Sequence, residues 1–165
     1  MNNKVLGKKS MDRAEKAGTI EREQFGGRHG QSSIIAALNK RLTMDLIRLK
    51  RTAAALLSND AKSCFDRMVH NMTCLAFRRQ GVDENTLRSL FLTLQKSVHR
   101  VRTAFGVSEA SYWGDEDDPV NGIGQGNGAG PTGWVFQSTP IISMMKAEGF
   151  GFADTLAKLR LYRRL

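Results

Sequence analysis

Residues 52–67 read TAAALLSNDAKSCFDR, and the fold class depends on the structure of the first nine of them. The run from Thr52 to Asp60 is short and apolar at its centre, which fits either a continued helix or a buried strand. A strand ending at Asp60 would place this carboxylate at the strand tip, where Mg²⁺ is held together with substrate phosphates. In the alternative, Asp60 caps a helix and Phe65 belongs to the core.

The segment before this stretch predicts two helices separated by a glycine loop. A short basic helix spans residues 4–16 and ends at Gly18, and residues 24–30 then place three glycines in five positions. This loop would bring Arg28 and its backbone close to a partner. Ser32 or Ser33 then caps a helix whose apolar side chains form one stripe that we expect to be buried: Ile34, Ile35, Leu38, Leu42, Leu46 and Leu49.

The segment after residue 60 mixes helical patterns with a strand pattern. Two amphipathic helices are predicted, one from Phe65 to Arg79 and one beginning at Asp83, followed by a strand or hairpin over residues 99–113. Residues 122–133, GIGQGNGAGPTG, then lead into an apolar helix from about Pro131 to Glu148. Helices and strands interleave without a regular βαβ order, so the fold class is α+β.

Composition indicates a globular unit with a polyanionic partner. The chain has 165 residues, 41% of them hydrophobic, and a net charge of +9. Residues 1–60 carry 12 basic and 6 acidic groups (+6), residues 61–114 carry 8 and 4 (+4), and residues 115–165 carry 5 and 6 (−1). Nucleic acid is therefore the favoured partner. Cys64 and Cys74 lack the spacing of a zinc site or a disulfide framework. Without a signal peptide or a membrane span, we expect an intracellular protein, cytoplasmic or nuclear, with no membrane partner.

The glycine run admits several interpretations. It contains a GxGxxG match at Gly128, Gly130 and Gly133, but no apolar strand precedes it, so a dinucleotide-binding site is disfavoured. Glycines before a helix do offer backbone N–H groups to a phosphate or sugar, and Gln125 can both donate and accept there.

Three segments together resemble reverse transcriptases. Residues 59–67 resemble the first catalytic block, residues 122–131 are similar to the glycine-glutamine-glycine block, and residues 23–33 look like the block that precedes the catalytic strand. The resemblance implies an incomplete right-hand polymerase fold with part of the fingers and the early palm, and it favours the strand for residues 52–60. It also implies one partial domain over residues 1–165, with fingers-side helices over about 1–52 and a palm-like segment over 53–165.

The resemblance implies a role for each candidate site residue. Asp60 would coordinate catalytic Mg²⁺ with help from the Ala61 carbonyl, within a two-metal scheme. Phe65 would exclude nucleotides with a 2′-hydroxyl. Gln125 and Gly126 would line either the pocket of the deoxynucleoside triphosphate or the template side. The RNA or DNA template-primer would contact four basic residues, Arg28, Lys40, Arg41 and Arg48.

The chain departs from the family after the glycine block. It has no Tyr/Phe-x-Asp-Asp hairpin, and Phe152–Thr155 holds only one aspartate. It also lacks the family's thumb and its earlier fingers block. We therefore expect a partial enzyme that does not polymerise alone, with only part of the two-metal site. The alternative is a non-catalytic, basic nucleic-acid-binding remnant, and the basic side chains of residues 40–51 also fit an ordinary solvated helix face.

Overall fold

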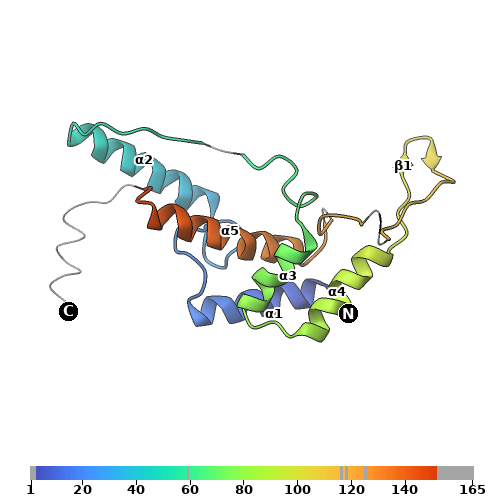
Figure 1. The fold of residues 1–165 in the computed structure, drawn as a ribbon. Coiled ribbons are helices and arrows are strands. Elements are labelled where there is room, and N and C mark those ends of the chain that lie inside the picture. The colour runs from blue at the N-terminus through green and yellow to red at the C-terminus, as the bar shows by residue number, and fades with distance from the viewer. Residues whose placement is uncertain (1–2, 59, 116, 118, 125, 152–165) are drawn as a thin grey trace. The chain divides into compact units, whose positions relative to one another are not determined.

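The computed structural model describes residues 3–58, 60–115, 117, 119–124 and 126–151 (Figure 1). This part of the chain is helix-rich and has one small antiparallel sheet, compatible with the expected α+β class. Its elements in chain order are α1 (Asn3–Ala17), α2 (Ser33–Leu49), α3 (His70–Arg79), α4 (Glu84–Lys96), β1 (Arg102–Thr103), β2 (Gly106–Val107) and α5 (Gly130–Ala147). Among the described helices, none is both long and apolar enough to cross a membrane.

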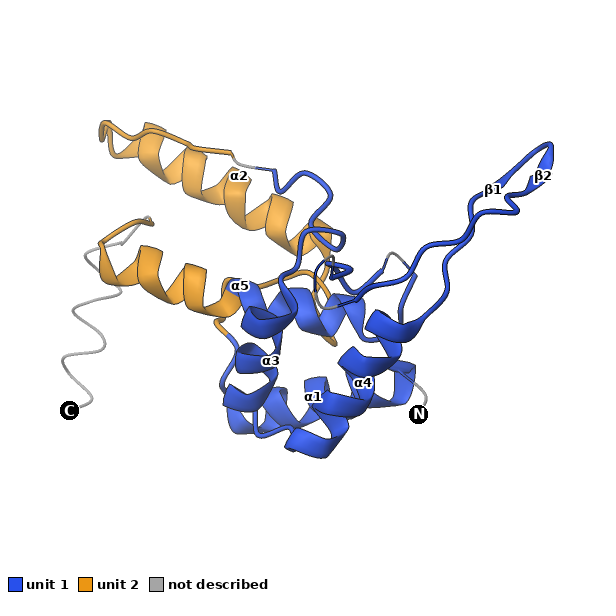
Figure 2. Ribbon diagram, turned by 45° about the vertical axis from the view of Figure 1, so that its right-hand side comes forward, with its two compact units in different colours: residues 1–20, 60–138 blue, residues 21–59, 139–165 orange. Residues whose placement is uncertain are grey.

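The chain divides into two compact units, each built from two separate stretches of sequence (Figure 2). Unit 1 consists of residues 1–20 and 60–138, and unit 2 consists of residues 21–59 and 139–165. Helix α5 contributes its first turns to unit 1 and its remaining turns to unit 2, and it runs through Pro140.

The hydrophobic core lies in unit 1. Phe77 of α3 and Phe136 of α5 meet edge to face, with ring centroids 5.1 Å apart. Leu87 and Leu90 of α4 are 1% exposed, as the predicted amphipathic pattern requires. The remaining core side chains come from α1, α3, α4, α5 and the loops next to them: Leu6, Met11, Ala14, Ile20, Met68, Ala76, Phe91, Ile123, Ala129 and Val135.

Helix α4 begins as the sequence predicts, whereas α3 begins five residues later than predicted. The Asp83 side chain accepts a hydrogen bond from the Thr86 amide at 2.9 Å and so caps α4. The expected helix start at Phe65 is wrong, because the Phe65 and Met68 carbonyls accept hydrogen bonds from Ile123 and Gly122 of the glycine run instead of from a helical turn. Helix α3 therefore starts at His70.

For residues 99–113, where the sequence predicts a strand or a hairpin, the structure shows a short hairpin. Strands β1 and β2 pair antiparallel, with Arg102 opposite Val107 and Thr103 opposite Gly106. Further from the tip, His99 pairs with Tyr112, and their rings stack with centroids 5.1 Å apart. In Figure 2 this hairpin extends away from the helices of unit 1.

The strand predicted for residues 52–60 is wrong for the residues that the structure describes there. Residues 52–58 and Asp60 form neither strand nor helix, and their side chains are exposed, Leu57 by 83%. An apolar run forms a buried strand only when a neighbouring strand supplies hydrogen bonds. The described sheet contains only β1 and β2.

The stripe expected to be buried on the second predicted helix is also exposed. Helix α2 starts after its Ser32 cap, as expected, and the Ser32 hydroxyl accepts from the Ile35 amide at 3.3 Å. None of the α2 residues is buried, and the half-buried ones, Ala36, Thr43, Met44 and Ile47, lie outside the predicted stripe. Helical periodicity identifies an apolar face but carries no information about what covers it.

Candidate functional site

Residues 60–67 form an exposed loop followed by a tight turn in unit 1. Asp60 is exposed, and it neither ends a strand nor caps a helix. The turn closes where the Asp66 amide donates to the Ser63 carbonyl at 3.0 Å, and Ser63 has a φ of 51°. Phe65 is half-buried and packs against the core of unit 1. The Phe65 ring therefore contributes to the packing of unit 1.

The start of the glycine run lies directly against this turn. The Ile123 amide donates to the Phe65 carbonyl at 3.0 Å, and the Gly122 amide donates to the Met68 carbonyl at 2.8 Å. A Cβ at Gly122 would lie only 2.6 Å from the Phe65 carbonyl oxygen, so only glycine allows this approach. Two of the three segments that carry the resemblance are thus in contact, although about 55 residues separate them in sequence.

A polar clamp holds the chain entering the glycine run, and sequence reasoning missed it. The His70 Nε2 atom donates to the Gly122 carbonyl at 2.6 Å, since a carbonyl can only accept, and Nδ1 then accepts from Gln95 Nε2 at 2.8 Å. Gln95 also donates to the Val120 carbonyl and accepts from the Val120 amide, at 2.7 and 3.0 Å. These partners are 25 or 52 positions apart, so no local pattern could have predicted the clamp.

The glycines of the run divide into packed and open positions. A Cβ at Gly128 would lie 2.5 Å from Lys4 Cα, so α1 and the run approach backbone to backbone. By contrast, a Cβ at Gly124 or Gly126 would meet nothing within 4 Å, and both residues have a positive φ. Gln125, predicted to line a nucleotide pocket, lies outside the described residues. The exposed backbone at Gly124 and Gly126 is therefore where this loop can approach a ligand.

The predicted Mg²⁺ ligands provide only part of a metal site. Asp60 and Ala61 are both exposed, and together they offer one carboxylate and one carbonyl. In the part of the chain that the structure describes, no group of three or more His, Cys, Asp or Glu side chains could hold a metal ion. Mg²⁺ usually keeps several waters and binds one or two carboxylates plus substrate phosphates. Asp60 and Ala61 by themselves therefore offer only part of the oxygen ligands that a two-metal centre needs.

Arg28 is engaged within its own loop in unit 2. Its Nη1 atom donates to the carbonyls of Glu21 and Gln24, at 2.9 and 3.2 Å. Gly27 and Gly30 on either side have φ values of 73° and 71°, which explains the glycines of this segment. The predicted contact of Arg28 with template phosphates would therefore compete with its role in closing the loop.

The other predicted nucleic-acid-binding residues lie on α2 and are exposed. Arg41 and Arg48 both pair with Asp45, at 3.1 and 3.5 Å, which reduces the charge that they offer to a phosphate. Lys40 is exposed on the same helix. Pairs of this kind are weak at an exposed surface, so a polyanion could displace them.

The acidic side chains before the glycine loop pair with the last part of α5 in unit 2. Lys146 contacts Glu21 at 2.7 Å and Glu23 at 3.2 Å, and these hydrogen bonds raise the pKa of Lys146 above its ordinary value. Ser143 also donates to Glu21, at 2.6 Å. This network gives Glu23, the first residue of the third resembling segment, a structural role.

Comparison with known proteins gives no relative: no family model, curated protein or solved structure matches this chain.

Proposed function

We propose that this chain is a segment of a reverse-transcriptase-like polymerase that binds a deoxynucleoside triphosphate and template-primer but does not polymerise by itself. One observation carries this proposal: the segment with Asp60 and Phe65 contacts the glycine run through the bonds from Ile123 and Gly122. A nucleotide site of this kind needs both segments at one place.

The proposed binding mode follows from what these segments expose. The Gly124 and Gly126 backbone lies open to a ligand, and Asp60 supplies a carboxylate on the neighbouring segment. When bound, Mg²⁺ would neutralise the triphosphate. A two-metal reaction needs further carboxylates, and the sequence has no Tyr/Phe-x-Asp-Asp hairpin after the glycine run to supply them, so the role proposed for this chain is binding.

The test measures binding of a deoxynucleoside triphosphate to the 165-residue chain, with and without Mg²⁺. We expect Asp60→Asn to remove the Mg²⁺-dependent part of the affinity. The matched control is Asp66→Asn, which removes a second exposed carboxylate from the adjoining turn and should leave that part unchanged. Equal effects of the two variants would show that Asp60 has no special role. With a primer-template, Mg²⁺ and all four triphosphates, we expect no primer extension.

A second candidate function is non-catalytic binding of single-stranded nucleic acid, and the β1–β2 hairpin favours it. Phe105 lies between the two strands and is fully exposed, while Tyr112 and Trp113 further along are more than half exposed. Arg100 and Arg102 are exposed beside them. Exposed aromatic rings with cationic neighbours are what single-stranded nucleic acid requires for base stacking and phosphate contact.

The hairpin can be tested with one matched pair of variants. Phe105→Ala should weaken binding of a single-stranded oligonucleotide, because a stacked base contributes about 1–3 kcal/mol. Phe150→Ala is the control, since Phe150 is also exposed but belongs to unit 2. Binding that is unaffected by Phe105→Ala would remove the hairpin from the interface.

A further inference from the structure

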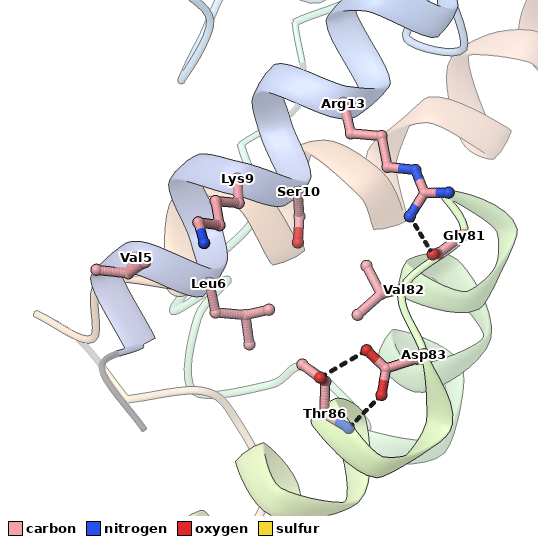
Figure 3. A pocket seen from close by; sticks show the side chains of 9 residues that line it. All are labelled: Val5, Leu6, Lys9, Ser10, Arg13, Gly81, Val82, Asp83 and Thr86. Atoms are coloured by element: carbon pink, nitrogen blue, oxygen red, sulfur yellow. Dashed lines mark hydrogen bonds between the residues drawn. The ribbon is translucent and has the colours of Figure 1, made fainter.

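Unit 1 contains a pocket between α1 and the start of α4, separate from the glycine run (Figure 3). Its volume is about 450 Å³, within the range of small-molecule sites. Leu6 and Val82 line it with apolar surface, while Lys9, Ser10 and Arg13 line it from α1.

Hydrogen bonds hold the two walls of this pocket together. Arg13 Nη1 on α1 donates to the Gly81 carbonyl at 2.8 Å, in the turn between α3 and α4. Thr19 just after α1 donates to the Gln80 side chain in the same turn. The pocket is therefore formed before any ligand arrives, which lowers the entropic cost of binding.

The α1 wall carries hydrogen-bond donors that the folded chain leaves available. Ser10 is only 5% exposed, and its hydroxyl, which points into the pocket in Figure 3, has no hydrogen-bond partner among the described residues. The Ser10 oxygen is not among the fully buried side-chain atoms without a partner, so water or a ligand in the pocket can reach it. Lys9 also lines the pocket from α1, and the structure gives Lys9 no ion pair with a described residue.

The opposite wall fixes the orientation of a ligand. The Asp83 carboxylate accepts from the Thr86 amide and hydroxyl, at 2.9 and 2.6 Å, and these bonds lower its pKa. Asp83 is therefore anionic at neutral pH and repels a negative group on its side. An anion in this pocket would lie against Lys9 and Ser10, and an apolar group would lie on Leu6 and Val82.

We propose that this pocket binds a small organic anion, with its charged oxygens on Lys9, Ser10 and Arg13 and its apolar body on Leu6 and Val82. This inference does not depend on the polymerase resemblance, because none of the three resembling segments lines the pocket.

The experiment titrates the full 165-residue chain with phenyl phosphate by calorimetry. Two comparison ligands are titrated separately: inorganic phosphate, which carries the anion alone, and benzyl alcohol, which carries an uncharged aromatic ring. We expect saturable binding of phenyl phosphate with a Kd on the order of 1 mM or lower, tighter than either comparison ligand. Lys9→Gln should weaken it about fivefold. Lys8→Gln is the matched control, since Lys8 is exposed on α1 but does not line the pocket, and it should change the Kd less than about twofold.

The Ser10→Ala variant distinguishes between two roles of the Ser10 hydroxyl, binding of the ligand and stabilisation of the fold. We expect about threefold weaker binding with no decrease in thermal stability, because the hydroxyl has no described partner to lose. Three results would overturn the proposal: phenyl phosphate binding no tighter than inorganic phosphate, equal losses for Lys9→Gln and Lys8→Gln, or a lowered melting temperature for Ser10→Ala.

Discussion

At Gly122 two backbone requirements coincide. Its φ is +86°, and a Cβ there would lie 2.6 Å from the Phe65 carbonyl oxygen and 2.7 Å from Asp66 Cα. Gly124 has a similar φ of +80°, but a Cβ there would meet nothing within 4 Å. A side chain at Gly124 would meet only the cost of a left-handed backbone, whereas a side chain at Gly122 would also meet a steric clash. Comparing the two positions therefore separates these two costs.

We predict that Gly122→Ala destabilises unit 1 more than Gly124→Ala does. Both variants should lose about 1–2 kcal/mol through the left-handed conformation. Gly122→Ala should lose a further amount of about 1–3 kcal/mol, because rigid backbone must move away from the new methyl group. Urea unfolding measures both free energies. Equal losses would mean that the glycine run does not pack on the turn at residues 63–68.

Asp83 gives stability a pH dependence with a defined sign. Its bonds to Thr86 lower its pKa, so its contribution is present above the carboxyl value of the unfolded chain, about 3.9, and is lost as pH falls through the folded value. We predict that Asp83→Ala is less stable than the unchanged chain at pH 7 and that this difference shrinks toward pH 2.5. Thermal unfolding at the two pH values checks this, with Asp83→Asn as a capping side chain that does not titrate.

At the scale of elements, α2 and α4 are both amphipathic, but the apolar face of α4 is buried and that of α2 is exposed. Leu90 of α4 is 1% exposed, whereas Leu42 of α2 is 52% exposed. The free energy released by burial follows the area removed from water, so the same residue type contributes differently in the two helices.

We predict that Leu90→Ala lowers the free energy of unfolding by about 2–5 kcal/mol and that Leu42→Ala changes it by less than about 0.5 kcal/mol. Both substitutions put a good helix former into a helix, so helix propensity does not explain the difference. Chemical denaturation gives both values. A large loss at Leu42 would indicate that the α2 stripe is covered in solution.

The element boundaries show which local signals are sufficient. The Ser32 and Asp83 caps mark the starts of α2 and α4 because a cap acts within three residues of its own position. The predicted start at Phe65 is wrong because amides of the glycine run donate to the carbonyls of Phe65 and Met68. A contact between segments more than 50 residues apart leaves no periodic trace in the sequence.

At the scale of the whole molecule, the uneven charge predicts salt-dependent binding of nucleic acid. The net charge is +9, and the first 114 residues carry 20 basic and 10 acidic groups (+10). If four phosphates are neutralised, the logarithm of the binding constant for a single strand should fall with log[salt] with a slope of about −3. Replacing Arg100 and Arg102 by Gln should reduce this slope by about 1.4. Fluorescence anisotropy with a labelled oligonucleotide over a salt series measures it, and a slope near zero would exclude phosphate binding.

The candidate site was only partly predictable from the sequence, because contacts between distant segments leave no local pattern. Asp60, Phe65 and the glycine run stand out by residue type and spacing, and the contact between Phe65 and Ile123 places two of these segments together. The His70–Gln95 clamp, the engagement of Arg28 with its own loop and the Lys9–Ser10 pocket follow from packing, and no sequence pattern indicates them.

Local patterns in the sequence were sufficient for the presence of the helices, the caps of α2 and α4 and the extended pattern at residues 99–113, because each depends on neighbours within a few residues. The basic charge follows from composition alone. Tertiary structure decided that residues 52–58 form no strand, that the α2 stripe is exposed and that the glycines at 122 and 128 serve packing while those at 124 and 126 stay open. Burial, strand pairing and close backbone approach each require a partner from a distant part of the chain, and the sequence pattern of one segment does not identify that partner.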